Sequence, residues 1–129
     1  MILDTSAVVA IFIEEPGFEA LEDAIAATEF VGIGTPTLTE SAIVLASRLA
    51  RDPRPTLRGF LHEFGLAEVA FGELHWRAAT EAFLRFGKGR HPAGLNYGDC
   101  MSYATARVAS QPLLFVGDDF RRTDIEAAL

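Results

Sequence analysis

The sequence has a single cysteine, Cys100, among 129 residues. An intrachain disulfide and a cysteine-based zinc cluster are therefore both excluded. No apolar run approaches the roughly 18 to 20 residues that a membrane span requires. The apolar start, Met1–Leu3, has no basic residues before it and ends at Asp4, so it does not resemble a signal peptide. These absences predict a cytoplasmic protein that does not bind membranes.

Positive charge is scarce and unevenly distributed. The first 47 residues contain eight acids and no lysine or arginine, and the net charge is −7. Taken alone, acidity on this scale argues against nucleic acid as a partner, because phosphate neutralisation requires lysine and arginine. Nine of the eleven basic residues fall into three later groups: Arg48, Arg51, Arg54 and Arg58; Arg85, Lys88 and Arg90; Arg121 and Arg122. Arginine outnumbers lysine ten to one, which favours forked contacts with phosphate or carboxylate, although solvated surface is the alternative for each group.

Half of the residues are hydrophobic, and the length suits one domain over residues 1–129. Short apolar runs predict strands, and helical periodicity predicts the segments between them. We expect strands at 1–3, 30–34, 66–71 and 113–116, and helices at 7–15, 18–27, 36–51, 56–64, 73–86 and 97–109. Thr5 or Ser6 should cap the first helix, Asn96 should cap the helix at 97–109, and Thr123-Asp124-Ile125-Glu126 has the capping-box pattern of a last short helix. The alternation predicts an α/β fold with a parallel sheet and helices on both faces.

Acidic residues occur where such a sheet forms a site. Asp4 follows the first predicted strand, and the Asp118–Asp119 pair follows the last. Glu40 lies early in a helix that follows a strand, and Asp99 lies in the first turn of its helix. Helix capping explains Asp4 or Asp99 taken alone. Converging carboxylates, however, repel one another unless a cation lies among them.

The ligands offered by these positions are all hard oxygens, with no cysteine and no histidine pair. This donor set favours Mg²⁺ or Mn²⁺ over zinc or copper. Magnesium held by a few carboxylates is typically used on phosphate substrates, where it polarises a phosphodiester and activates water.

Four motifs resemble those of a known family. The opening Met-Ile-Leu-Asp-Thr-Ser is similar to the start of PIN-domain proteins, and Thr-Pro-Thr-Leu-Thr-Glu, ending at Glu40, resembles their second acidic motif. Leu-Asn-Tyr-Gly-Asp-Cys around Asp99 resembles the third, and Leu-Phe-Val-Gly-Asp-Asp-Phe with the following Thr-Asp resembles the fourth. All four occur in order over nearly the whole chain. The pattern is similar to that of stand-alone VapC toxins, the ribonuclease halves of VapBC toxin–antitoxin pairs.

The resemblance implies a PIN-like three-layer α/β/α fold with four or five short parallel strands. It implies a divalent-metal endoribonuclease acting on structured RNA, with tRNA or rRNA as substrate, a VapB-type antitoxin as partner, and a homodimer. On this basis the catalytic candidates are Asp4, Glu40, Asp99, Asp118 and Asp119. Asp4 and Asp99 are expected to bind the metal directly, and the fourth acid is either Asp118 or Asp119.

Further side chains could support these acids. Thr5, Ser6 and Thr123 could hydrogen-bond the ligands, although helix capping is the commoner role for such residues. The candidate contacts to RNA phosphates are Lys88, Arg90, Arg121 and Arg122. The stretch 42–57 interleaves apolar residues with arginines and could form part of an antitoxin groove, with packing against a neighbouring helix as the alternative.

Other α/β proteins with acidic sites fit less well. A receiver domain needs a lysine after a late strand, whereas the only lysine is Lys88. A haloacid-dehalogenase-like phosphohydrolase needs a second aspartate two residues after Asp4, where Ser6 stands. Neither a Walker A loop nor a complete dinucleotide fingerprint is present. Two alternatives remain open: a degenerate PIN domain that only binds RNA or protein, and a housekeeping RNA-processing nuclease.

Overall fold

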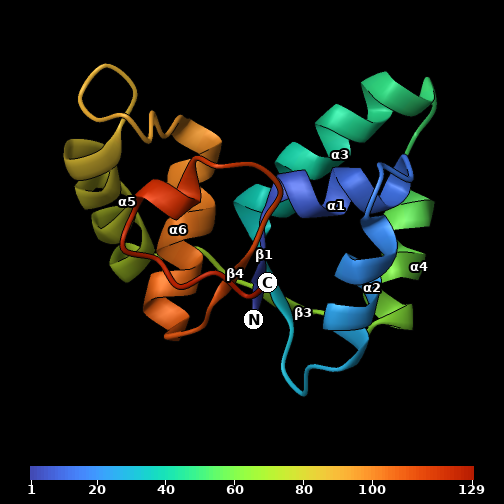
Figure 1. Ribbon diagram of the computed structural model, residues 1–129. Coiled ribbons are helices and arrows are strands. Elements are labelled where there is room, and N and C mark those ends of the chain that lie inside the picture. Colours follow the sequence, from blue (N-terminus) through green and yellow to red (C-terminus); the bar gives the residue numbers. More distant parts are fainter.

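The computed structural model describes residues 1–129 as a three-layer α/β/α fold (Figure 1). The strands are β1 (Ile2–Leu3), β2 (Gly32–Gly34), β3 (Ala67–Val69) and β4 (Leu113–Leu114). The helices are α1 (Thr5–Phe12), α2 (Phe18–Ala26), α3 (Thr35–Leu49), α4 (Arg54–Glu63), α5 (Glu73–Phe86) and α6 (Tyr97–Ala109), followed by a 3-10 turn, η1 (Phe120–Arg122). The predicted α/β class and four-stranded parallel sheet are confirmed.

The sheet has the order β3-β2-β1-β4, and every neighbouring pair is parallel. Its strands are short, and β1, β2 and β4 are buried on both faces. In β1, Ile2 belongs to the apolar cluster beside α5 and α6, whereas Leu3 belongs to the cluster beside α1 to α4. Leu113 and Leu114 divide in the same way. Continuous apolar runs of this kind are typical of parallel strands covered on both sides.

The helices form two separate layers. In Figure 1, α5 and α6 lie on one side of the sheet and α1 to α4 on the other, and both termini lie near the sheet. The carboxyl ends of β1, β2 and β4 point to the same edge, where α1, α3 and α6 begin. Parallel α/β sheets form their sites at this edge. None of the helices combines the length and hydrophobicity needed to cross a bilayer.

Two sequence expectations about helix ends are wrong. The cap expected at Thr5 or Ser6 is instead Asp4, for which capping was the alternative explanation; its side chain accepts a hydrogen bond from the Ser6 amide, and the helix begins at Thr5. The capping-box pattern at Thr123 opens no helix. There the Asp124 carboxylate binds side chains of α5 and α6, and the backbone continues beside β4 through the Ala127–Leu113 bridge. Tertiary contacts thus outweigh the local capping preference.

Candidate active site

Asp4 is positioned by the end of β1. Its amide donates to the carbonyl of Leu114 in β4, and its side chain is buried. Oδ2 accepts from the Ser6 amide at 3.0 Å and from the Ser6 hydroxyl at 2.6 Å. The Ser6 hydroxyl in turn accepts from the amide of Val116, just after β4. Ser6 therefore joins the first acid to the segment that carries the last two.

Glu40 lies in α3, which begins directly after β2. Burial raises the pKa of its carboxyl, the nearby Thr5 side chain lowers it, and the charge of Asp4 raises it, with a net increase. The Thr5 hydroxyl is buried and makes no hydrogen bond of standard geometry, although it lies close enough to influence Glu40. The Glu40 carboxylate occupies the space that a Cβ on Gly98 would fill. The absence of a side chain at Gly98 therefore lets Glu40 approach the first turn of α6.

Asp99 lies in that first turn, within a reciprocal capping box. Its amide donates to Oδ1 of Asn96, and its Oδ2 accepts from the Asn96 amide. Burial is the largest cause that raises the pKa of Asp99, to about 6; the Asn96 amide opposes this rise, and the charges of Asp4, Asp119 and Glu40 add to it. Asp99 is therefore coupled electrostatically to acids from three other segments.

The Asp118–Asp119 pair lies in the exposed turn between β4 and η1. Asp119 is among the charges that raise the pKa of Asp99, and Asp118 is not. The carbonyl of Asp118 accepts from the Arg121 amide, and that of Asp119 from the Arg122 amide. The coupling to Asp99 favours Asp119 as the fourth acid, a choice that the sequence left open.

The four acids approach one another without forming a ready cage. No three His, Cys, Asp or Glu side chains are arranged closely enough to hold a metal ion. Asp4 and Asp99 instead accept hydrogen bonds from local helix-cap donors. The donor chemistry nevertheless fits a hard divalent cation, because coupled carboxylates supply only oxygen ligands. Binding such an ion would require the four carboxylates to turn toward a common point.

The predicted supporting side chains differ in their surroundings. Ser6 binds Asp4 directly, and Thr5 adjoins Glu40. The Thr123 hydroxyl donates to the Phe120 carbonyl and accepts from the Ile125 amide, so its hydrogen bonds stabilise the turn after η1.

The predicted phosphate contacts lie on two segments. Lys88 and Arg90 are exposed on the loop between α5 and α6, where the Arg90 guanidinium lies 5.5 Å from the centre of the Phe83 ring. Arg121 and Arg122 belong to η1; Arg121 lies over Phe115, and Arg122 donates to the carbonyl of Pro92. Both segments adjoin elements that carry an acid, since α6 carries Asp99 and the turn before η1 carries Asp119.

Sequence reasoning missed the network that anchors the last segment. Oδ1 of Asp124 accepts from the Tyr103 hydroxyl at 2.6 Å, and Oδ2 lies 3.2 Å from Arg85 and 3.6 Å from Arg107. The only available signal was the Thr-Asp pair that follows the fourth motif, which we interpreted as a helix start. The network attaches the segment after Asp119 to α5 and α6.

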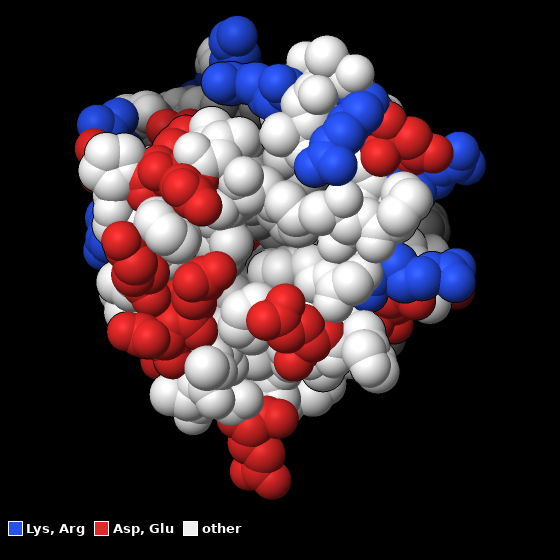
Figure 2. Space-filling view, turned by 90° about the vertical axis from the view of Figure 1, so that its right-hand side faces the viewer, with Lys and Arg blue, Asp and Glu red and all other residues white.

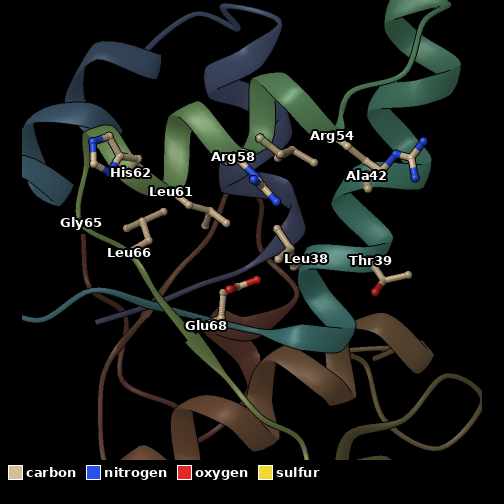
Figure 3. Close-up of a pocket in the computed structure, with 11 residues that line it drawn as sticks. Leu38, Thr39, Ala42, Arg54, Arg58, Leu61, His62, Gly65, Leu66 and Glu68 are labelled. Carbon is tan, nitrogen blue, oxygen red and sulfur yellow. The ribbon is translucent and has the colours of Figure 1, made fainter.

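A groove of about 930 Å³ lies between α3, α4 and β3, and none of the four acids lines it. Its walls combine apolar and basic side chains (Figure 3). The apolar residues are Leu38, Leu57, Leu61 and Leu66, and the basic residues are Arg54, Arg58 and His62. In Figure 3, Arg58 extends from α4 toward the side of the groove formed by Glu68. Figure 2 shows this side of the molecule, with acidic side chains gathered at the left and in the lower part of the view and most basic side chains along the upper and right margins.

Comparison with known proteins places the chain in one family. Residues 1–126 match the model of the PIN domain. The chain is 48% identical over 127 residues to "Ribonuclease VapC" of Mycolicibacterium smegmatis, covering 98% of each protein. It is 46% identical to "Ribonuclease VapC36" of Mycobacterium tuberculosis, covering 98% of this chain and 91% of the relative.

Solved structures share the fold at low sequence identity. The toxin VapC20 of M. tuberculosis, described as cleaving the sarcin–ricin loop, superposes with a TM-score of 0.72 at 15% identity, covering 96% of this chain and 95% of that one. A chain from a toxin–antitoxin complex of Klebsiella pneumoniae gives a TM-score of 0.67 at 16% identity, covering 92% of this chain and 88% of that one. At these identities the likeness shows the fold alone.

Proposed function

This chain belongs to the PIN-domain family, and we propose that it is a VapC-type toxin endoribonuclease that uses Mg²⁺ or Mn²⁺ to hydrolyse phosphodiester bonds in tRNA or rRNA. One arrangement carries the proposal: the Glu40 carboxylate lies against Gly98 beside Asp99, Ser6 links Asp4 to the segment of Asp119, and the charges of these acids raise the pKa of Asp99. A fold rarely gathers carboxylates in this way without a cation-dependent task. The ribonuclease names of the relatives at 46–48% identity support the choice of RNA.

Each acidic residue has a proposed role in the reaction. Asp4 and Asp99 would hold the metal, with Asp119 completing the set directly or through water. When bound, the ion would polarise the phosphodiester and lower the pKa of the attacking water. Glu40 would orient that water and accept its proton on the carboxylate, a role that its raised pKa favours. Ser6 would keep Asp4 in place through the 2.6 Å hydrogen bond.

Cleavage of purified tRNA and rRNA tests this assignment. The protein should cut with Mn²⁺ or Mg²⁺ and lose that activity in EDTA or as Asp99→Asn, whereas Glu63→Gln on α4 serves as a matched acidic control and should remain active. Cleavage that persists unchanged in EDTA or in Asp99→Asn would overturn the proposal. A chain that never cuts RNA yet binds it would support the binding-only alternative.

Metal binding has an independent measurement. Mn²⁺ should raise the melting temperature of the wild-type protein by mass action, and Asp4→Asn or Asp99→Asn should weaken that response. No response in the wild type would exclude the proposed metal site.

The proposed partners are a VapB-type antitoxin and a second copy of the chain. A solved toxin–antitoxin complex with the same fold supports the antitoxin. The groove between α3 and α4 supports a site for it, because its leucines would receive an apolar helix face while Arg58 would meet acidic residues (Figure 3). Arg58→Glu should weaken binding of a co-expressed antitoxin from a neighbouring gene, and Arg51→Glu outside the groove should not.

Light scattering of the purified chain tests the homodimer.

A further inference from the structure

A second pocket lies between α5, α6 and the segment before α5. Its volume is about 410 Å³, within the range of small-ligand sites. Seven of its eight lining residues are hydrophobic, and four of these are aromatic. The eight are Phe71, Trp76, Ala79, Thr80, Phe83, Tyr97, Cys100 and Met101. The proposed ribonuclease activity assigns no role to this pocket.

Helix α6 places the pocket beside the acids. Tyr97, Cys100 and Met101 line the pocket from the first turns of the helix that also carries Asp99. At about 100° per residue, Asp99 points away from these three side chains, so the helix body separates the pocket from the acids. That body is about 10 Å thick, a distance that roughly three stacked nucleotides of one strand would cover.

The aromatic side chains present their rings to solvent. Tyr97 is 79% exposed, Trp76 52% and Phe83 39%. None of these three rings pairs with another aromatic ring of the protein. Exposed aromatic area around a hollow is costly in water and is typical of surfaces that bind a flat or apolar group.

The charges around the pocket suit an anionic ligand. The Arg90 guanidinium lies 5.5 Å from the centre of the Phe83 ring and pairs with no acid, whereas Arg77, 4.8 Å from the centre of the Trp76 ring, is paired with Glu73 at 3.0 Å. No acidic residue lines the pocket. Aromatic rings beside an arginine suit a nucleotide, because its base can stack on a ring and its phosphate can pair with the guanidinium.

We propose that this pocket receives one unstacked nucleobase of an RNA, a few nucleotides from the phosphodiester that the acids cleave. The proposal rests on the proposed ribonuclease function. Thr80 is the only side chain with a hydroxyl among the residues from α5, and that hydroxyl donates to the carbonyl of Trp76. The Tyr97 hydroxyl and the Trp76 indole N–H are the polar side-chain groups left to contact a base, so recognition would rely mainly on stacking.

A second copy of the chain fits this pocket less well. A stable dimer interface buries about 800 Å² per partner over some 20 to 30 residues. The pocket itself is concave and small; exposed apolar side chains continue along α5 at Leu74 and Leu84, but the exposed charged residues Glu73, Arg77 and Glu81 interrupt them. A protruding group such as a base fits such a hollow better than a flat helix face does.

Trp76 is the only tryptophan in the chain, so its fluorescence reports on the pocket. The experiment titrates Asp99→Asn, in EDTA to prevent cleavage, with a uridine hexanucleotide and with a hexamer of abasic ribose phosphates. We expect the uridine hexamer to quench the fluorescence of Trp76 and the abasic hexamer to leave it unchanged. Equal quenching by both would overturn the proposal, as would no quenching by either.

Kinetics separate this proposal from the function on which it rests. Trp76→Ala should raise KM for RNA by about 5- to 150-fold, the usual effect of losing one stacked base, with little change in kcat. Trp76→Phe should restore most of the affinity, and Leu74→Ala, an exposed α5 leucine outside the pocket, should change neither constant. An unchanged KM in an active Trp76→Ala would overturn the base pocket and leave the ribonuclease intact.

Two further outcomes complete the test. If the wild-type protein cuts no RNA but the uridine hexamer still quenches Trp76, the proposed function fails while the base pocket stands. If Trp76→Ala converts a dimer to a monomer in light scattering, the pocket is a subunit interface and the proposal is wrong.

Discussion

The Glu40 carboxylate lies against the Cα of Gly98, in the space that a Cβ would occupy. Glycine in a helix costs about 0.5–1 kcal/mol relative to alanine, yet Gly98 lies in the first turn of α6. Its φ is ordinary for a helix, so backbone conformation does not require glycine there. The close approach of Glu40, one residue from Asp99, provides the reason.

Gly98→Ala should therefore impair catalysis without harming the fold. The new methyl group would displace the end of the Glu40 side chain, and a displacement near 1 Å costs up to about 100-fold in rate. Because alanine favours the helix, the melting temperature should stay constant or rise. The measurements are RNA cleavage and thermal unfolding. Gly59→Ala in α4, where a Cβ meets no atom within 4 Å, is the control and should gain stability with full activity; equal activity of the two variants would contradict the role of Gly98.

Asp99→Asn should stabilise the metal-free protein at neutral pH. The folded pKa of Asp99 is about 6, above its unfolded value of about 3.9. The folded state therefore binds more protons than the unfolded state, and stability falls as pH rises from about 4 to 6. The full shift corresponds to about 3 kcal/mol, which solvent screening at this partly exposed site reduces to about 1 kcal/mol.

Thermal unfolding in EDTA measures this effect. At pH 7.5 the melting temperature of Asp99→Asn should exceed that of the wild type by about 3 °C, and at pH 4 the two should agree. Asparagine keeps an oxygen that can accept from the Asn96 amide, so the capping box survives the change. An equal difference at both pH values would mean that packing, not charge, separates the two proteins.

The sequence predicted most of this arrangement where local signals act alone. Asn96 caps α6 and Glu73–Phe86 forms α5, as expected, because side-chain caps and apolar periodicity are encoded within single segments. Local signals did not predict where η1 begins or the path of the backbone after Thr123. There Asp124 binds partners 17 to 39 residues away in sequence, and nothing in the four-residue capping pattern reveals them.

The candidate site shows the same division. Spacing relative to predicted strands was enough to nominate Asp4, Glu40 and Asp99. The choice between Asp118 and Asp119 depends on which of the two side chains lies nearer to α6. The sequence does not distinguish them, because they are adjacent residues of the same type in one turn. The role of Gly98 was missed for a related reason. Gly98 leaves room for Glu40 of another helix, α3, and the sequence around Gly98 does not reveal that contact.

Asp119→Asn and Asp118→Asn should differ. Asp119 is among the charges that raise the pKa of Asp99, and Asp118 is not, so only Asp119→Asn should abolish cleavage and weaken the Mn²⁺-induced rise in melting temperature. We expect at least a 100-fold loss of activity for Asp119→Asn, the scale of removing one group that stabilises charge in the transition state. Steady-state cleavage and thermal shift with Mn²⁺ measure both. The opposite ranking would make Asp118 the fourth acid.

Asp124→Ala should loosen the segment that carries Asp119. The Asp124 carboxylate accepts from Tyr103 and pairs with Arg85 and Arg107, which together hold the pKa of Asp124 below its ordinary value despite the opposing effect of burial. Hydrogen bonds to charged groups contribute about 1.5–3 kcal/mol, and partial exposure places this one near the lower end. We therefore expect a lower melting temperature and weaker Mn²⁺ binding, with KM for RNA little changed.

The pH dependence identifies the charge as the cause. Because the folded pKa of Asp124 is depressed, its contribution is present above the unfolded pKa of about 3.9 and is lost as pH falls through the folded value. The difference between wild type and Asp124→Ala should therefore be constant from pH 6 to 8 and shrink below pH 4. Tyr103→Phe removes only the hydroxyl donor and should reproduce part of the loss in both stability and Mn²⁺ binding. If Asp124→Ala lowers the melting temperature while Mn²⁺ binding stays at the wild-type level, the network supports the fold but does not position Asp119.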